Sequence, residues 1–277
     1  MQKRILTIQD ISCVGQCSLT VALPIISACG VETCILPSAV LSTHTGGFSG
    51  FTFRDLTEDM PLIEKHWQAE KIKFDGIYTG YLGSAKQIDY VKSIFQSCMA
   101  DDGVKIVDPA MADNGKLYVG FDHAFVEKMK TLCSTADVIL PNLTEACLLI
   151  DEPYPETYDE TLIDRILTKL SSLCKDATIV LTGIGYKAEK TGVIVYAKGE
   201  KEYYEHRKIS KGCHGTGDIY ASAFVGALMR GKSYYESAKI AADYTVACIE
   251  ATQDDPSHWY GARFETSLPK LITALEK

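Results

Sequence analysis

The feature that most constrains this 277-residue chain is a regular alternation of short apolar runs with longer segments of helical period. The short runs are typical of buried β-strands and lie at residues 4–9, 33–37, 76–79, 104–108, 138–140 and 178–182. Segments with apolar side chains at helical spacing lie between them, at residues 18–28, 55–70, 84–99, 121–133 and 161–174. This alternation predicts β-α-β units that build a mostly parallel sheet with helices on both faces.

The pattern changes after Gly183. Residues 192–197 and 202–206 predict two antiparallel strands joined at Lys198-Gly199-Glu200, and helical patterns follow to the end of the chain. The sequence has no internal repeat, low-complexity tract or flexible linker. We therefore expect residues 1–277 to form one α/β domain with three layers, a sheet between two layers of helices.

Composition excludes several classes of partner. The net charge of −8 disfavours binding to nucleic acid or to an anionic membrane. The longest apolar stretch, residues 21–31, is too short to cross a bilayer. The first residues include no cleavable apolar segment, so we expect a cytoplasmic protein. The ten cysteines include no CxxC pair, which predicts free thiols and no zinc site.

Polar residues cluster where the predicted strands end, which is where open parallel sheets bind ligands. They are Asp10 after the first strand, residues 42–47 after the second, Gly80-Tyr81 after the third, Asp108 with Asp113 after the fourth, Asn142 with Glu145 after the fifth, and Thr182-Gly183 after the sixth. Their repeated placement at one edge indicates a ligand site there.

The segment Gly212-Cys213-His214-Gly215-Thr216-Gly217-Asp218 directly precedes an apolar helical run. Its glycines let several N–H groups point one way, and the helix N-terminus adds a positive dipole end, so the turn can bind an anion. Asp218 is placed to take a proton from a hydroxyl that attacks a phosphoryl group. Ordinary helix capping by an Asp after glycines explains the same residues, and the turn alone leaves both readings open.

Other phosphate and nucleophile motifs are absent. The sequence has neither GxxxxGK[ST] nor GxSxG, which excludes a P-loop enzyme and the usual hydrolase elbow. Residues 183–188 fit a GxGxx[GA] pattern after a strand, but a second strand follows them where a dinucleotide-binding fold would have a helix.

Three motifs together resemble the ribokinase-like family of small-molecule kinases, over essentially the whole chain. They are the Gly215-Thr216-Gly217-Asp218 turn, Asp108-Pro109-Ala110-Met111-x-Asp113-x-Gly115, and Pro141-Asn142-Leu143-Thr144-Glu145. Ser-Thr-His-Thr-Gly at 42–46 and Thr-Gly-Tyr-Leu-Gly-Ser at 79–84 are similar to the pyridoxal kinases, more particularly a bacterial branch called pyridoxamine kinases. The resemblance implies a ribokinase-like fold and ATP-dependent phosphorylation of the 5′-hydroxymethyl group of pyridoxal, pyridoxamine or pyridoxine.

The resemblance also implies a role for each matching residue. Asp218 would be the base, and the N–H groups of Gly215, Thr216 and Gly217 would hold the γ-phosphoryl group. The pyridine pocket would be lined by His44, Thr45 and Tyr81. ATP would contact Asp108, Asn142, Glu145, Thr182 and Thr216, and Mg²⁺ would be organised by Asp108, Asp113 and Glu145, in part through its waters. The family implies a homodimer; a monovalent-cation requirement stays open.

Two positions depart from the family pattern. Asp10 stands where many pyridoxal kinases have a serine after Ile-Gln, and our hypothesis is that this carboxylate retunes preference among the vitamers. Cys213 precedes the glycine turn and would contact the substrate, either packing beside it or adding to the pyridoxal aldehyde as a thiohemiacetal.

Other functions stay open at this point. The nearest is a kinase for another small alcohol, such as hydroxymethylpyrimidine or a sugar, and His44, Thr45 and Tyr81 disfavour the sugar. A non-catalytic vitamer-binding protein would not need Asp218 as a base. A thiol redox protein would rest on Cys213 alone. Residues 254–261 have a distinctive composition but no assigned role.

Overall fold

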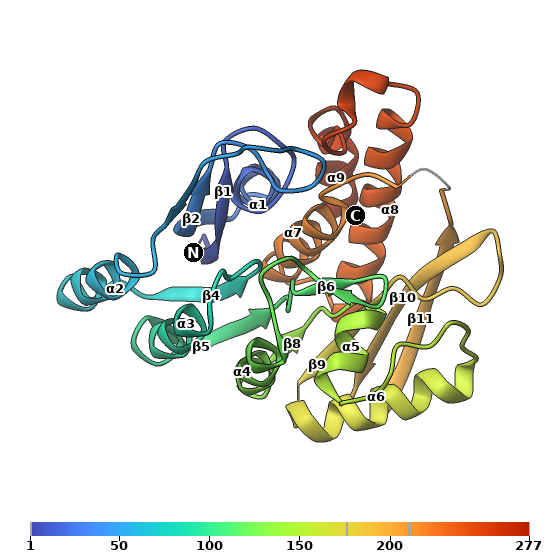
Figure 1. Cartoon of the computed structure of the whole chain (residues 1–277), viewed down its shortest axis with the longest axis horizontal. Helices are drawn as coiled ribbons and strands as arrows, with labels where there is room; N and C mark the ends of the chain where they lie inside the picture. Colours follow the sequence, from blue (N-terminus) through green and yellow to red (C-terminus); the bar gives the residue numbers. More distant parts are fainter. Residues whose placement is uncertain (1, 176, 210–211, 277) are drawn as a thin grey trace.

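The computed structural model describes residues 2–175, 177–209 and 212–276. The strands of its main sheet are β1 (Arg4–Ser12), β2 (Glu32–Leu41), β3 (Phe53–Asp55), β4 (Phe74–Thr79), β5 (Met99–Val107), β8 (Val138–Ile139), β9 (Thr178–Thr182), β10 (Lys190–Ala197) and β11 (Glu200–Arg207). They are arranged in the order β11-β10-β9-β8-β5-β4-β1-β2-β3 (Figure 1). The strands from β9 to β2 in this order pair in parallel, and β3, β10 and β11 pair antiparallel. The predicted mostly parallel sheet is confirmed.

Helices cover both faces of the sheet. One layer holds α2 (Met60–Ala69), α3 (Ala85–Ser97), α4 (His123–Cys133), α5 (Leu143–Leu149) and α6 (Glu160–Cys174), and the other holds α1 (Leu19–Ala28), α7 (Thr216–Met229), α8 (Tyr234–Thr252) and α9 (Leu268–Leu275). Consecutive strand residues serve opposite layers, because side chains alternate across a strand. Leu6 packs with the α2–α6 layer and Ile5 packs with the layer of α1 and α7. One apolar core therefore lies on each side of the sheet.

Some element boundaries differ from the prediction. The helix expected over 55–70 is wrong at its start: Asp55 ends β3, and its Oδ1 accepts hydrogen bonds from the Thr57 N–H and hydroxyl at 2.8 and 2.6 Å, which forms a turn before α2. The helix expected over 84–99 ends at Ser97, and Met99 begins β5. Helix α5 and a hairpin of β6 (Ala112–Asp113) and β7 (Lys116–Leu117) were not predicted.

The sheet contains a switch point at β1. The chain runs from β1 to β2 on one side and later returns to β4 on the other side, and crevices at such points bind ligands in open α/β sheets. Strand β1 also continues to Ser12, beyond its predicted end at residue 9. Its register with β2 shifts between Gln9 and Ile11, so Asp10 lies at an irregularity beside the switch point.

No helix in the described part of the chain is both long enough and apolar enough to cross a membrane.

Candidate active site

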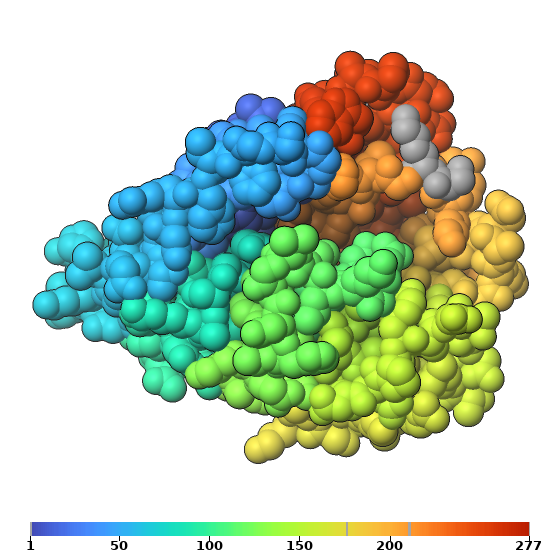
Figure 2. Space-filling model, in the orientation of Figure 1, coloured from blue at the N-terminus to red at the C-terminus, as the bar shows by residue number. Residues whose placement is uncertain are grey.

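The carboxyl ends of the parallel strands border a hollow in the molecular surface. Figure 2 shows this hollow between the segment that follows β2 and the segment that follows β5, with α7 at its floor. The predicted site residues come from these segments, from the ends of β1, β4, β8 and β9, and from the start of α7. The sheet therefore gathers residues that are distant in sequence around one opening.

The turn before α7 requires glycine at position 215. Gly215 has a φ of 75°, and a Cβ atom there would lie 1.6 Å from the carbonyl oxygen of Gln16. Helix α7 starts directly after it, with Thr216 and Gly217 in the first turn. Their N–H groups have no acceptor within the helix and stand at the positive end of its dipole. This turn is suited to hold an anion such as a phosphoryl group.

Asp218 lies half-buried in the same helical turn. Burial above all raises its pKa to about 7, the negative charge of Asp10 adds to the rise, and the N–H of Ser18 acts in the opposite direction. A carboxyl group whose pKa lies near neutral pH can both accept and release a proton there. The surroundings of Asp218 therefore suit the predicted general base.

Ser18 links Asp218 to Asp10. It is buried and has a φ of 55° and a ψ of −133°, a conformation that residues other than glycine rarely adopt. Its N–H lowers the pKa of Asp218, and its hydroxyl lowers that of Asp10. Burial nevertheless raises the pKa of Asp10, whose Oδ2 also accepts a hydrogen bond from the Ser12 hydroxyl at 3.2 Å. The two carboxyl groups are thus neighbours around one serine.

Asp218 also has neighbours in a second group of carboxylates. Burial, followed by the charges of Glu145 and Asp218, raises the pKa of Asp108 well above its usual range. Burial likewise raises the pKa of Glu145 to about 7. In the described ranges, no lysine or arginine forms an ion pair with any of these three residues. Buried carboxylates without a paired cation favour the binding of one.

Glu145 and Asn142 fix the loop that carries Asp108. The carboxylate of Glu145 accepts hydrogen bonds from the N–H groups of Met111 at 2.9 Å and Asn142 at 3.0 Å. The Asn142 side chain accepts from the Glu145 N–H at 3.0 Å and donates to the Ala112 carbonyl at 2.8 Å. This capping box starts α5 and attaches residues 111–112 to it. Contacts of Glu145 and Asn142 with ATP stay predictions.

Asp113 lies at the start of a tight hairpin turn. Its carboxylate accepts hydrogen bonds from the backbone and side-chain N–H groups of Asn114 at 2.8 and 2.9 Å, and Asn114 and Gly115 both have positive φ. Such a pair is typical of a two-residue β-turn. Among the residues that the structure describes, no three His, Cys, Asp or Glu side chains lie close enough to hold a metal ion by themselves. The carboxylates near Asp108 still fit a hard divalent cation that keeps some of its waters.

His44 is buried, and both of its ring nitrogens bind backbone groups. The N–H of Gly46 donates to Nδ1 at 3.0 Å, so Nε2 carries the proton and donates to the carbonyl oxygen of Tyr260 at 2.6 Å. The imidazole also packs against the rings of Phe48 and His214, at 5.1 and 5.3 Å between centroids. His44 therefore holds the loop after β2 in place, and its ring nitrogens are not free for a substrate.

The other predicted substrate residues lie near the same opening. Tyr81 is half-buried, stacks on Phe121 at 5.4 Å between centroids, and has its pKa raised by burial and by the charge of Asp10. Thr45 is exposed on the loop that His44 holds. Cys213 is half-buried, and its carbonyl accepts a hydrogen bond from the Thr216 hydroxyl at 3.4 Å.

Thr182 lies at the end of β9, where its N–H donates to the Pro141 carbonyl at 3.0 Å. The same residue forms a bridge with Asn142, so the two predicted ATP-contacting positions adjoin each other.

Two parts of the site escaped prediction. Ser18 looks like an ordinary helix-starting serine in the sequence, and only its backbone conformation reveals that it faces two carboxylates. The segment 254–261, which had no assigned role, reaches the site from the far end of the chain together with Ala262. The Tyr260 carbonyl binds His44, and the Ala262 N–H donates to the His214 carbonyl at 3.3 Å. No local motif signals either contact.

Comparison with known proteins agrees with this geometry. A family model described as phosphomethylpyrimidine kinase matches residues 23–262, which is most of the chain. The chain belongs to the phosphomethylpyrimidine kinase family. It is thus a small-molecule kinase, and the resemblance seen in its motifs is confirmed.

Individual proteins extend the match. A Bacteroides thetaiotaomicron protein assigned to the phosphomethylpyrimidine kinases and crystallised with pyridoxal is 36% identical, with a TM-score of 0.92 over 98% of this chain and 96% of that one. The pyridoxal kinase of Lactobacillus plantarum is 31% identical, with a TM-score of 0.92 over 100% and 99% of the two chains. The pyridoxal kinase PdxY of Haemophilus influenzae is 25% identical over 90% of each chain. The predicted ribokinase-like α/β fold is confirmed by these likenesses.

Proposed function

We propose that this kinase transfers the γ-phosphoryl group of ATP to the 5′-hydroxymethyl group of a vitamin B6 vitamer. The observation that carries the proposal is the junction at Ser18, where a base with a pKa of about 7, Asp218, adjoins the buried carboxyl group of Asp10. The anion-binding turn at Gly215 leads directly into the helix that carries the base. The pyridoxal-containing Bacteroides structure and the two pyridoxal kinases support the choice of substrate.

Proton transfer and phosphoryl transfer belong to one step in this account. Asp218 accepts the hydroxyl proton while the substrate oxygen bonds to the γ-phosphorus and the bond from that phosphorus to the ADP oxygen breaks. The N–H groups of Gly215, Thr216 and Gly217 stabilise the charge on the transferred group.

The carboxylates around Asp108 serve the nucleotide in the proposal. Asp108 and Glu145, with Asp113 at the edge, would hold Mg²⁺ in part through water. The ion supplies positive charge that neutralises the phosphates. Asn142 and Thr182 lie beside these carboxylates, at the ends of neighbouring strands, and would contact ATP. In the described ranges no lysine or arginine is paired with Asp108 or Glu145, and this supports their assignment as residues that hold Mg²⁺.

The vitamer ring would lie against Tyr81, Thr45 and the loop that His44 holds. Asp10 would recognise a protonated ring nitrogen or another polar substituent, because a buried carboxylate binds a charged donor strongly. We propose that Asp10, in the place of the family's serine, shifts preference among pyridoxal, pyridoxamine and pyridoxine.

Cys213 has two proposed roles at this site. It packs beside the substrate, or its sulfur adds to the aldehyde carbon of pyridoxal while the thiol proton passes to the aldehyde oxygen. Only pyridoxal has this aldehyde, so Cys213→Ala distinguishes the two: unchanged turnover of pyridoxal relative to pyridoxine contradicts the covalent role.

The family also supports an alternative substrate, hydroxymethylpyrimidine, because the matching model describes phosphomethylpyrimidine kinases. By analogy with the pyridoxal kinases, we further propose that residues 1–277 act as one domain in a cytoplasmic homodimer. Size-exclusion chromatography with light scattering tests the dimer.

A substrate panel tests the function. The protein is incubated with Mg²⁺ and ATP and, separately, pyridoxal, pyridoxamine, pyridoxine and hydroxymethylpyrimidine, and the phosphorylated product is measured. Turnover of a vitamer above that of the pyrimidine supports the proposal. Preference for the pyrimidine supports the alternative, and vitamer binding without turnover of any compound supports a non-catalytic binding protein.

A further inference from the structure

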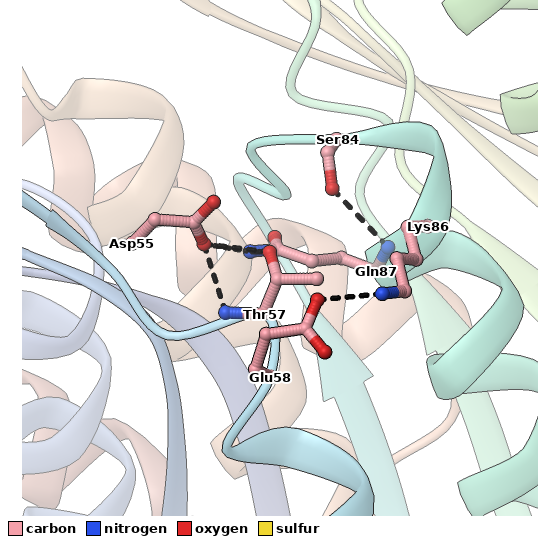
Figure 3. Close-up of polar contacts among 6 residues, drawn as sticks. All are labelled: Asp55, Thr57, Glu58, Ser84, Lys86 and Gln87. Atoms are coloured by element: carbon pink, nitrogen blue, oxygen red, sulfur yellow. Dashed lines mark hydrogen bonds and ion pairs between the residues drawn. The ribbon is translucent and has the colours of Figure 1, made fainter.

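A buried amide with no part in the proposed chemistry lies behind the substrate loop. This loop, residues 80–84, joins β4 to α3 and carries Tyr81. Gln87 lies in the first turn of α3 and is only 1% exposed. Figure 3 shows its side chain directed from α3 toward the turn that carries Asp55 and Thr57. A buried glutamine is costly unless each of its polar groups finds a partner.

The Gln87 amide is hydrogen-bonded at both ends. Its Oε1 accepts from the Gly83 N–H at 2.7 Å, and its Nε2 donates to the Ser38 carbonyl at 3.0 Å and to the Thr57 hydroxyl at 2.8 Å. The Thr57 hydroxyl donates its own proton to Asp55 at 2.6 Å and so can only accept from Gln87. If the amide were flipped, its NH₂ group would face the Gly83 N–H and its oxygen would face the Ser38 carbonyl. The hydrogen-bond partners therefore fix one orientation of the Gln87 amide.

The same network reaches Tyr81 by a second route. The Ser38 hydroxyl donates to the Tyr81 carbonyl at 3.3 Å, while the Ser38 carbonyl binds Gln87. The Tyr81 ring stacks on Phe121. The loop is therefore held at the Tyr81 carbonyl by Ser38 and at the Gly83 N–H by Gln87. Gln87 makes the second attachment directly and supports the first through its bond to the Ser38 carbonyl.

We propose that Gln87 is a positioning residue of the vitamer pocket, which sets the place of Tyr81 by fixing the backbone at Gly83 and, through Ser38, at Tyr81 itself. The inference rests on the proposed function. Gln87 contacts neither the turn at Gly215 nor the carboxylates around Asp108 in the described structure. Its loss should therefore weaken vitamer binding and leave ATP binding unchanged.

An exposed ion pair beside Gln87 provides a matched control. Lys86 Nζ lies 2.5 Å from Glu58 Oε1 and joins the same two segments, α3 and the turn before α2, on the surface (Figure 3). The two side chains are 53% and 78% exposed, and such pairs contribute little to stability. Lys86→Met removes a contact between these segments without touching the buried amide.

The main test compares Gln87→Met with Lys86→Met. In Gln87→Met we expect the vitamer KM to rise about fivefold or more, because the Gly83 N–H loses its acceptor and Tyr81 loses its fixed place, with the ATP KM within about twofold of wild type. Lys86→Met should leave both constants unchanged. A purely structural role predicts a lower Tm with an unchanged vitamer KM per active site, and that result, or an equal rise in both KM values, would overturn the proposal.

A second variant and hydrogen exchange keep the test decisive if Gln87→Met folds poorly. Ser38→Ala removes only the hydroxyl that binds the Tyr81 carbonyl and leaves the Gln87 amide with its partners, so vitamer KM should rise while the ATP KM stays within about twofold of wild type. Amide exchange over residues 80–84 needs no turnover. It should quicken in Gln87→Met and in Ser38→Ala but not in Lys86→Met, even if wild type phosphorylates no vitamer. Unchanged exchange in Gln87→Met, or unchanged exchange and vitamer KM in Ser38→Ala, would contradict the proposal.

Discussion

The imidazole of His44 donates a hydrogen bond to the carbonyl oxygen of Tyr260, a residue 216 positions further along the chain, at 2.6 Å. The same C-terminal segment reaches the proposed phosphate side of the site, because the N–H of Ala262 donates to the carbonyl of His214 just before the glycine turn. Residues 258–262 therefore fasten the loop after β2 and the anion turn to each other. This segment therefore contacts both halves of the proposed site, which the strand ends and α7 bring together.

Variants of His44 separate its two hydrogen bonds. Glutamine can place a donor where Nε2 lies, whereas asparagine can only replace Nδ1, so His44→Gln should keep the bond to Tyr260 and His44→Asn should lose it. Trp259 reports the difference: it packs on Phe48 at 4.6 Å between centroids and is the only tryptophan besides Trp67.

In a Trp67→Phe background, His44→Asn should shift Trp259 emission to the red and lower vitamer kcat/KM about tenfold, while His44→Gln stays close to the parent. Equal spectra and rates for both variants would mean that the bond to Tyr260 does not hold the segment.

The ionised form of Asp218, which the proposed mechanism needs near neutral pH, should lower the stability of the folded protein. Its pKa is about 7 in the folded protein against an ordinary 3.8, so between about pH 4 and pH 7 the folded state holds more protons than the unfolded state. Stability contributed by this group therefore falls as pH rises through that window. Asp218→Asn never ionises, and its Tm should exceed that of wild type by about 2–4 °C at pH 8, for a gain of roughly 1 kcal/mol, and by less near pH 4. Calorimetry at the two pH values checks this; a variant less stable than wild type at pH 8 would refute the burial cost.

Asp10→Ser should change both selectivity and pH dependence. Loss of the carboxylate alters the kcat/KM ratio among the three vitamers, and loss of its charge lowers the pKa of Asp218, since Asp10 helps to raise it. The acidic limb of the kcat/KM profile should then move to lower pH. Asp10→Asn keeps the shape of the side chain but removes its charge, so it should move the acidic limb in the same direction. If neither the limb nor the kcat/KM ratios change, Asp10 affects neither the pKa of Asp218 nor the choice of vitamer.

The two glycines flanking Thr216 should respond differently to alanine. At Gly215 an added Cβ meets the Gln16 carbonyl at 1.6 Å and φ is 75°, so Gly215→Ala should fold poorly or lose more than about 3 kcal/mol. At Gly217 an added Cβ meets nothing within 4 Å, so Gly217→Ala should be as stable as wild type. If the first-turn N–H groups bind the transferred phosphoryl group, this stable variant still loses kcat by about tenfold or more. A fully active Gly217→Ala would argue against the anion turn.

Periodicity was sufficient for the layers of the fold and for the clustering of strand ends. The parallel strands are buried on both faces, so they carry apolar side chains on both sides of the sheet. Ile5 and Leu6, for example, are neighbours in β1 and pack into the cores on opposite sides of the sheet. Short elements carried too little signal. The three-residue strand β3 was not predicted, and its last residue, Asp55, was assigned to an expected helix because the turn at Asp55 depends on its hydrogen bonds to Thr57.

The site was predictable only where a local motif encodes it. The Gly215–Asp218 turn is such a motif, since the positive φ at Gly215 favours glycine and a Cβ there would clash with the Gln16 carbonyl. That His44 lines the vitamer pocket stays a prediction from the motif. Its hydrogen bond to Tyr260 was not predictable, because the two residues are remote in sequence and no periodicity or spacing links them. Ser18 has an unusual backbone conformation that its residue type does not announce.

The most direct test of the account is formation of vitamer 5′-phosphate by wild type and by Asp218→Asn, measured with Mg²⁺ and ATP on the preferred vitamer. Equilibrium dialysis of the same vitamer serves as the control for binding. The account predicts turnover by wild type and a loss of kcat of about 10²–10⁴-fold in Asp218→Asn, with vitamer binding retained. Full activity in Asp218→Asn, or vitamer binding without turnover in wild type, would contradict it.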